Sequence, residues 1–146
     1  MKVKIKRIDK ELPLPQYQTS GAVAFDLYSR VDTQVEPGEI KAVPANVIVC
    51  APEGYMFMVT ARSSLAKKKG LMLSNGVGVI DQDYCGPDDE VHVLLYNFKN
   101  EPCEIKRGER LAQGIFVKID KGEWEEVEET ESPTRGGMGS TEGYNK

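Results

Sequence analysis

Short apolar runs separated by turn-forming residues recur along most of this chain. The N-terminal run KVKIKRI alternates Val3 and Ile5 with lysines, which is the period of a half-buried β-strand. Four further runs, rich in β-branched and aromatic residues, are typical of strands: VIVCA, YMFMVTA, VHVLLYNF and LAQGIFVKI. The segments EPGE, APEG, CGPDDE, KNEP and KRGE favour turns between them. This spacing predicts an antiparallel sandwich or barrel.

Only the segment SSLAKKKG, residues 63–70, has helical character. Ser63 or Ser64 can cap its start and Gly70 can end it, which predicts a helix of one or two turns. A nucleotide-binding fold of alternating strands and helices is disfavoured, because its crossover connections need longer helices.

The composition changes near Lys121. Residues 123–131 contain six glutamates, interrupted by Trp124 and Val127, and the segment SPTRGGMGSTEGYNK follows. Its backbone amides, hydroxyls and guanidinium are donors that suit phosphate oxygens, so we expect a mobile tail that orders over a ligand. A terminus without a role is the alternative. The segment is not a Walker A loop, since no lysine precedes Ser140 and no helix follows.

The whole-chain numbers narrow the class of protein. With 146 residues, of which 40% are apolar, the chain suits a single domain with one core. The formal net charge is −4 and the basic residues are dispersed, which gives no argument for nucleic-acid or membrane binding. The N-terminus lacks a signal-peptide pattern, and no run approaches the roughly 18 apolar residues of a membrane helix. We therefore expect a cytoplasmic protein.

The cysteines and the histidine restrict the chemistry. Cys50, Cys85 and Cys103 are an odd number without a CxxC pair, so we expect three reduced thiols. His92 is the only histidine, which excludes a zinc site built on several histidines. A Ser-His-Asp triad would have to use His92, but its place in EVHVLLYN favours a packed or solvated strand residue.

Three segments hold polar residues suited to an anion. Arg62, Ser63 and Ser64 follow the strand YMFMVTA where the helix begins, a position that favours anions, although ordinary helix capping is the alternative. Asp26 lies within the apolar run AVAFDLYS and needs a partner, for which an arginine is natural, unless it is exposed. Gln113 and Arg110 lie on the strand of GERLAQGIF, which alone is a weak signal.

The segment NGVGVIDQDYCG, residues 75–86, is the most informative. Asn75 can pair with the amide edge of a base, and Gly76 and Gly78 let the backbone approach a flat ring. Tyr84 can stack on a sugar. The pattern predicts a hairpin that reads a nucleoside.

The apolar and acidic residues of this hairpin have separate roles. We expect Val77, Val79 and Ile80 to anchor it to the core. Asp81 and Asp83 share a face if the strand continues and separate if the chain turns.

Five segments in order, AVAFDLYS, ARSSLAKK, NGVGVIDQDYCG, GERLAQGIF and TRGGMGSTEG, span residues 22–143. Together they make the chain resemble the trimeric dUTP pyrophosphatases (dUTPases). The third segment is very specific, whereas the second and fourth are shared with dCTP deaminases. The resemblance implies a β jelly roll or distorted barrel with one short helix. Residues 1–120 would form the catalytic domain, and residues 121–146 a C-terminal strand and a mobile Gly-rich arm closing over a site in a homotrimer.

The resemblance also implies the reaction, in which dUTP is hydrolysed to dUMP and pyrophosphate by water attacking the α-phosphorus. Asp81 would activate the water, with Mg²⁺ held through substrate phosphates and water rather than directly by the protein. This activity would keep uracil out of DNA and supply dUMP for thymidylate synthesis.

The resemblance assigns roles to individual residues. Asp81, Ser63 and Gln113 would be catalytic, and Asp26 would brace the arginines. Tyr84 would pack on the deoxyribose and leave no room for a 2′-hydroxyl. The implied substrate-binding residues are Arg62, Ser63, Ser64, Asn75, Gly78, Val79, Asp81, Tyr84, Gln113, Arg135, Met138, Gly139, Ser140 and Thr141.

The chain departs from the family pattern in two places. Met138 stands where the arm of the family usually has phenylalanine, and Cys85 stands where arginine is common. The acidic residues of the GPDDE turn favour a solvated turn over a metal site. Two other functions stay open, a dCTP deaminase, perhaps bifunctional, and a non-catalytic nucleotide-binding regulator.

Overall fold

A computed structural model describes residues 1–137 of the chain. The elements in chain order are β1 (Lys4–Arg7), β2 (Phe25–Tyr28), β3 (Thr33–Val35), β4 (Ile40–Pro44), β5 (Val47–Cys50), β6 (Tyr55–Ala61), α1 (Leu65–Lys69), β7 (Leu71–Leu73), β8 (Gly78–Ile80), β9 (His92–Asn97), β10 (Cys103–Ile105) and β11 (Arg110–Lys118). The all-β class with one short helix is therefore confirmed.

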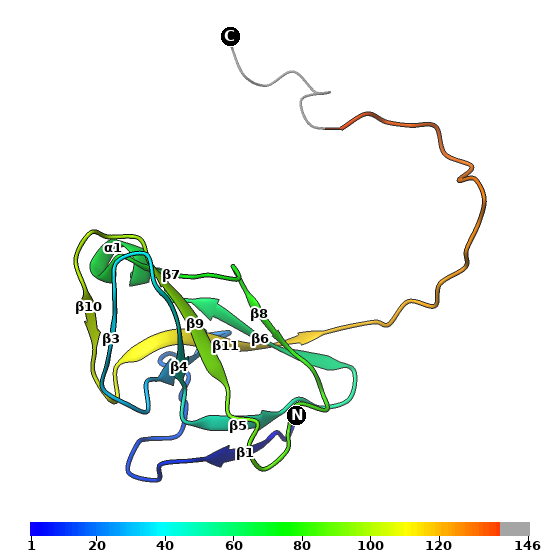
Figure 1. The fold of residues 1–146 in the computed structure, drawn as a ribbon. Helices are drawn as coiled ribbons and strands as arrows, with labels where there is room; N and C mark the ends of the chain where they lie inside the picture. Colours follow the sequence, from blue (N-terminus) through cyan, green and yellow to red (C-terminus); the bar gives the residue numbers. More distant parts are fainter. Residues whose placement is uncertain (138–146) are drawn as a thin grey trace.

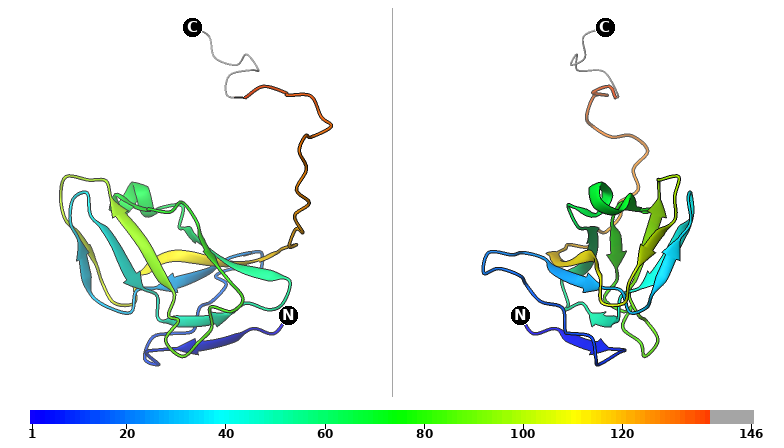
Figure 2. Two further views of the ribbon diagram at one scale, coloured as in Figure 1. Left: turned by 45° about the vertical axis from the view of Figure 1, so that its right-hand side comes forward. Right: turned by 90° about the vertical axis from the view of Figure 1, so that its left-hand side faces the viewer.

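The strands form four antiparallel sheets around one core (Figures 1 and 2). A four-stranded sheet, β2-β11-β6-β8, faces a three-stranded sheet, β4-β9-β7, and the pairs β1-β5 and β10-β3 extend the body. The fully buried side chains include Leu27, Val43, Phe57, Leu71 and Leu95. Within residues 1–137 no sheet closes on itself, so the body is a set of packed sheets rather than a continuous barrel.

The strand predicted from YMFMVTA has the predicted bounds, since β6 runs from Tyr55 to Ala61. It pairs with β11 along seven residues, from Ala112 opposite Ala61 to Lys118 opposite Tyr55. Gly114, in the middle of β11, allows the aromatic core to approach the backbone. A Cβ atom there would lie 2.5 Å from the ring of Phe57 and 2.7 Å from that of Phe25. Aromatic packing therefore explains a glycine that strand propensity disfavours.

The predicted helix is confirmed as α1. Ser64 is its N-cap residue but makes no capping hydrogen bond through its side chain, and Gly70 ends it in the left-handed conformation with φ of 69°. The three lysines of its last turn complement the negative end of the helix dipole. This leaves Arg62 and Ser63 on the turn between β6 and α1.

The prediction of three reduced cysteines is wrong for two of them. The structure joins Cys50, at the end of β5, to Cys85 by a disulfide, and their Cα atoms lie 5.2 Å apart. The turn after β8 brings Cys85 back to β5 across 35 residues of sequence, and cysteine spacing alone does not show that approach. Cys103 is free and buried, and burial raises the pKa of its thiol.

Thiol titration distinguishes the two states. In protein purified without reductant and unfolded in denaturant, we expect one reactive thiol per chain, and three after reduction. In the folded protein we expect Cys103 to react slowly at neutral pH, because a raised thiol pKa leaves little thiolate. Three thiols in the unfolded, unreduced protein would contradict the disulfide.

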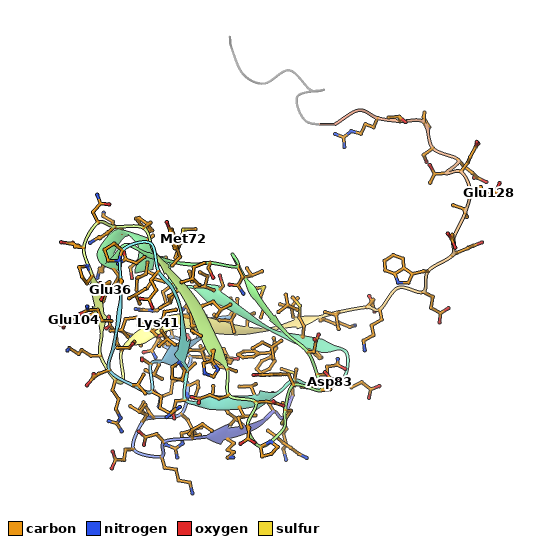
Figure 3. All side chains as sticks on the ribbon, in the orientation of Figure 1. Glu36, Lys41, Met72, Asp83, Glu104 and Glu128 are labelled. Atoms are coloured by element: carbon orange, nitrogen blue, oxygen red, sulfur yellow. A yellow bond between two sulfur atoms is a disulfide. The ribbon has the colours of Figure 1, made fainter. Side chains whose placement is uncertain are left out.

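Residues 121–137 follow β11 as an extended, exposed segment that leaves the body (Figures 1 and 2). Trp124 is 97% exposed, and Glu128 stands clear of the body in Figure 3. The structure assigns no strand within residues 121–137, so the predicted C-terminal strand and arm stay predictions. In residues 1–137 no helix is long and apolar enough to cross a membrane.

Candidate active site

Asp26 organises the first group of polar side chains. It lies on β2 and is 1% exposed, opposite Gln113 of β11 in the sheet register. Its two carboxylate oxygens lie 3.1 Å from Arg62 Nε and 3.1 Å from Arg110 Nη1, and Gln113 Nε2 donates to it at 3.4 Å. The predicted arginine partner of Asp26 is therefore confirmed.

This group concentrates positive charge beside a single buried carboxylate. The side chains of Arg62 and Arg110 are partly exposed, so their remaining N–H groups can reach an anion while Asp26 holds their orientation. Ser63 and Ser64 lie next to Arg62 on the turn into α1. In the sequence Arg110 was only a weak signal beside Gln113, and the resemblance gave it no role of its own; the structure places it against Asp26. We call these side chains the phosphate cluster (Asp26, Arg62, Ser63, Ser64, Arg110, Gln113).

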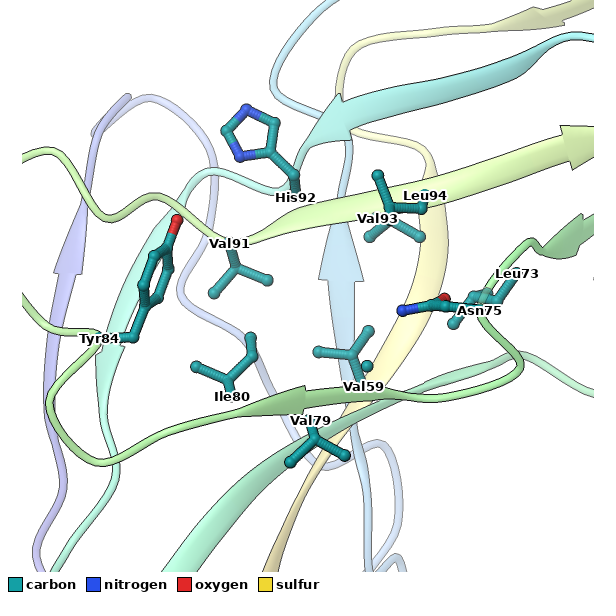
Figure 4. A pocket seen from close by; sticks show the side chains of 11 residues that line it. Val59, Leu73, Asn75, Val79, Ile80, Tyr84, Val91, His92, Val93 and Leu94 are labelled. Carbon is teal, nitrogen blue, oxygen red and sulfur yellow. The ribbon is translucent and has the colours of Figure 1, made fainter.

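A second group lines a cavity of about 240 Å³ between β8 and β9. The predicted residues Asn75, Gly78, Val79 and Tyr84 all line it. Figure 4 shows the Asn75 amide pointing into the cavity and the Tyr84 ring forming its opposite end. The remaining lining residues are Val59, Leu73, Ile80, Val91, His92, Val93 and Leu94. Because the sequence predicts that these residues contact a nucleoside, we call this cavity the nucleoside pocket.

The hairpin backbone gives the pocket its shape. Gly76 is left-handed with φ of 70°, and its N–H donates to the Leu73 carbonyl at 3.1 Å. At Gly78 a Cβ atom would lie 3.3 Å from the Val59 side chain, so a side chain there would crowd the wall of the pocket. These contacts explain why glycine suits both positions, and the predicted approach of a flat ring to the backbone stays a prediction.

The predicted anchoring of the hairpin holds for one residue of three. Ile80 packs against the core, whereas Val77 and Val79 are exposed, Val79 by 60%. In β8 only alternate side chains face inward, so a run of apolar residues does not mean that all of them are buried. His92 is a strand residue, as predicted, but it also lines the nucleoside pocket, which the sequence did not indicate.

Asp81 and Asp83 lie on a turn, because β8 ends at Ile80. The Tyr84 N–H donates to the Asp81 carbonyl at 3.4 Å, and the Gln82 side chain donates to the Tyr55 carbonyl at 3.0 Å. Both aspartates line a second cavity, of about 310 Å³, that Lys121 also lines. Asp83 is labelled at the edge of the body in Figure 3. Asp81 therefore lies one residue beyond the nucleoside pocket, with its carboxylate exposed.

The phosphate cluster and the nucleoside pocket lie at opposite edges of one sheet. Asp26 is on β2 and Gly78 on β8, with β11 and β6 between them, which separates the two edge strands by roughly 14 Å. Gln113 and Thr60 lie on the same face of the sheet as Val79, which lines the nucleoside pocket, so only the Asp26 end of the phosphate cluster is separated from the pocket by the width of the sheet.

The GPDDE turn differs from its prediction at one residue. Glu90 is 7% exposed and binds Arg30 through both carboxylate oxygens, at 2.8 and 2.9 Å, so it is not solvated. Asp88 is exposed, and Asp89 accepts a hydrogen bond from the Gly86 N–H. An acidic residue that closes the turn by pairing inside the fold cannot be distinguished by composition from a solvated one.

The structure describes only part of the predicted C-terminal arm. Arg135 is exposed in the extended segment. The predicted binding residues Met138, Gly139, Ser140 and Thr141 lie outside the described residues. Among residues 1–137 no group of three or more His, Cys, Asp or Glu side chains is placed to hold a metal ion.

Comparison with known proteins gives a consistent result. A family model described as dUTPase matches residues 10–142. The chain is 45% identical over 147 residues to the deoxyuridine 5′-triphosphate nucleotidohydrolase of Dictyoglomus turgidum, covering 97% of this chain and 98% of that protein. It is 42% identical over 143 residues to the protein of the same name from Nautilia profundicola, covering 97% and 99%.

Solved structures agree with the sequence relatives. The crystal structure of dUTPase from Streptococcus mutans has a TM-score of 0.76 and 30% identity, covering 82% of this chain and 98% of that one. The Staphylococcus bacteriophage 80alpha dUTPase with dUPNHPP has a TM-score of 0.85 and 25% identity, covering 96% and 98%. The match in sequence over nearly the whole chain, together with the shared fold, shows that this chain belongs to the dUTPase family.

Proposed function

We propose that this protein hydrolyses dUTP to dUMP and pyrophosphate. The observation that carries the proposal is the nucleoside pocket, in which the Asn75 amide and the Tyr84 ring lie at opposite ends and the adjoining turn carries Asp81. Curated relatives over nearly the full length of the chain are named deoxyuridine 5′-triphosphate nucleotidohydrolases.

In the proposed reaction a water molecule attacks the α-phosphorus and the bond to the bridging oxygen of the β-phosphate breaks. The Asp81 carboxylate takes the proton of the water, and pyrophosphate leaves. Arg62, Ser63 and Gln113 bind the oxygens on which charge develops. A Mg²⁺ ion bound with the triphosphate would neutralise part of that charge, held through phosphate oxygens and water rather than directly by side chains.

Recognition of uracil follows from hydrogen bonding. The extended backbone of β8 has N–H and C=O groups that match the carbonyl and N3–H of uracil, and the Asn75 amide adds a donor and an acceptor. Cytosine has a different pattern at the same edge, so it would leave buried groups of the pocket unpaired, at a cost of about 1–3 kcal/mol each.

We propose that the active site is shared between chains of a homotrimer. One chain would supply the nucleoside pocket, a second the phosphate cluster and a third Arg135, Ser140 and Thr141 of its arm. The separation of Asp26 on β2 from the nucleoside pocket at β8, at opposite edges of one sheet, supports this arrangement. Sedimentation of the full chain should give the mass of a trimer, and a monomer that turns over dUTP would contradict the shared site.

The proposed activity removes dUTP, which limits incorporation of uracil into DNA, and it yields dUMP, the substrate for thymidylate synthesis. We propose a cytoplasmic site of action, where deoxynucleotide pools are used.

A pyrophosphate-release assay with each nucleotide tests the function. We expect rapid release from dUTP, far less from dCTP, dTTP and UTP, and a fall in rate when Mg²⁺ is chelated. Release of ammonia from dCTP would instead identify a dCTP deaminase, and tight dUTP binding without pyrophosphate release would identify a non-catalytic regulator. As the control for chelation, Mg²⁺ is restored to the same sample and pyrophosphate release is measured again.

A further inference from the structure

The turn that follows Tyr84 is fixed to the body by one buried side chain. Glu90 accepts hydrogen bonds from Arg30 Nε at 2.8 Å, from Arg30 Nη2 at 2.9 Å and from the Asn46 N–H at 2.9 Å. Both carboxylate oxygens are therefore occupied. Bidentate pairing of this kind fixes direction as well as distance.

The partners of Glu90 are themselves held in place. Asn46 has a left-handed backbone, with φ of 68°, and its side-chain amide accepts from the Asp9 N–H at 2.7 Å and donates to the Asp9 carbonyl at 3.0 Å. The hydrogen bonds that Arg30 donates to the Glu90 carboxylate raise the pKa of Arg30. The Glu90 carboxylate is therefore bound by a charged side chain and by a backbone amide that are both fixed in place.

The carbonyl oxygen of Glu90 contacts two residues that line the nucleoside pocket. The Tyr84 hydroxyl donates to it at 3.3 Å, and His92 Nδ1 lies 2.8 Å from it. Tyr84 and His92 both line the pocket, and Figure 4 shows Tyr84 to the left of Val91 and His92 above it. The next residue, Val91, makes two backbone hydrogen bonds. Its carbonyl accepts from the Ala45 N–H at 2.8 Å, and its N–H donates to the Val47 carbonyl at 2.8 Å.

We propose that Glu90 is a positioning residue that determines the preference for deoxyribose. Its carboxylate fixes the end of the turn to Arg30 and Asn46, and its carbonyl oxygen holds Tyr84 and His92 at the sugar end of the pocket. This proposal rests on the proposed function, in which Tyr84 packs against the deoxyribose.

The physical reason is the size of the difference that the pocket must detect. A ribose differs from a deoxyribose by one oxygen atom, and an apolar wall rejects an added hydroxyl only weakly if it can move. A wall that shifts by about 1 Å makes room for much of that atom, whereas a wall fixed at its hydroxyl end does not. Removing one partner of this pair leaves the other without its counter-charge, so the variants below are compared by a ratio of two substrates rather than by activity alone.

The test compares the ratio of kcat/KM for dUTP to kcat/KM for UTP. We expect Glu90→Ala to lower this ratio about tenfold, and Arg30→Met to lower it by a similar factor. Glu90→Gln keeps an acceptor for the Asn46 N–H and should lose less. Asp88→Asn removes a charge from the same turn but leaves the contacts of the Glu90 carboxylate with Arg30 and Asn46 intact. Its ratio should therefore match that of the unchanged protein.

A purely structural role predicts a different result. Both substrates would then lose efficiency together, and an unchanged ratio in folded Glu90→Ala and Arg30→Met, assayed well below their Tm, would overturn the proposal. If both variants fail to fold, the ratio of kcat/KM for dUTP to that for UTP is measured in Glu90→Gln instead. A lowered ratio supports the proposal, and an unchanged ratio overturns it.

A binding measurement separates this proposal from the proposed function. If the unchanged protein releases no pyrophosphate from dUTP, the proposed function fails. The thermal shifts given by dUMP and by UMP then test Glu90 without turnover. A preference for dUMP that weakens in Glu90→Gln supports the positioning role, and an equal preference in both proteins contradicts it.

Discussion

Replacing Asp81 by asparagine is expected to lower kcat for dUTP about 10²- to 10⁴-fold, the contribution usual for a general base. Asparagine keeps the shape of the side chain but cannot take a proton from water. Because Asp81 is exposed on the turn after β8 and lies beyond the nucleoside pocket, nucleotide binding should be largely kept. The measurements are single-turnover pyrophosphate release and the Kd of a non-hydrolysable dUTP analogue.

Asp83→Asn is the matched control for this variant. Asp83 lines the same cavity, two residues away, and loses the same charge. We expect its kcat to stay close to that of the unchanged protein. If Asp83→Asn is inactive while Asp81→Asn turns over normally, Asp83 is the base and the assignment to Asp81 is wrong.

Replacing Asp26 by asparagine is expected to affect both stability and substrate binding. An amide cannot balance two guanidinium groups, and both Arg62 and Arg110 lose a charge-assisted partner in a nearly buried site. We expect a cost of about 2–3 kcal/mol, below the full penalty of a broken buried pair because both arginines can turn toward water. Thermal unfolding measures this cost.

The kinetic effect of Asp26→Asn follows from the same contacts. Arg62 and Gln113 lose the acceptor that aims them, so we expect KM for dUTP to rise and kcat to fall. Glu104→Gln is the control, because Glu104 pairs with Lys106 at an exposed site and its loss should leave Tm and kinetics unchanged. A stable Asp26→Asn variant with unaltered kinetics would show that Asp26 does not orient the phosphate cluster.

Much of the fold was predictable from local pattern. The strands β6 and β9 and the helix α1 follow from runs of apolar residues and from end signals such as Gly70. Alternation also determines which side chains of a strand can face the core. In β8 the prediction that every apolar residue is buried ignored this alternation, and Val79 is exposed. These features depend on neighbours within a few residues, and so they are encoded locally.

The sequence predicted which types of residue form the candidate site, but not which of these residues contact one another. The need of Asp26 for an arginine follows from its apolar neighbours, but the choice of Arg62 and Arg110, 36 and 84 residues away, comes from the pairing of β2, β11 and β6. The pairing of Cys50 with Cys85 and the burial of Glu90 against Arg30 have the same origin.

The sequence by itself determined the strand-rich body, the short helix and the set of residues suited to a nucleotide. The tertiary structure alone decided that Asp26 gathers two distant arginines, that a separate cavity forms between β8 and β9, and that Glu90 is an internal anchor rather than a solvated charge. The physical reason is that sheet register and turn closure bring together groups that are distant in the chain. Their burial and partners then depend on contacts that no local pattern contains.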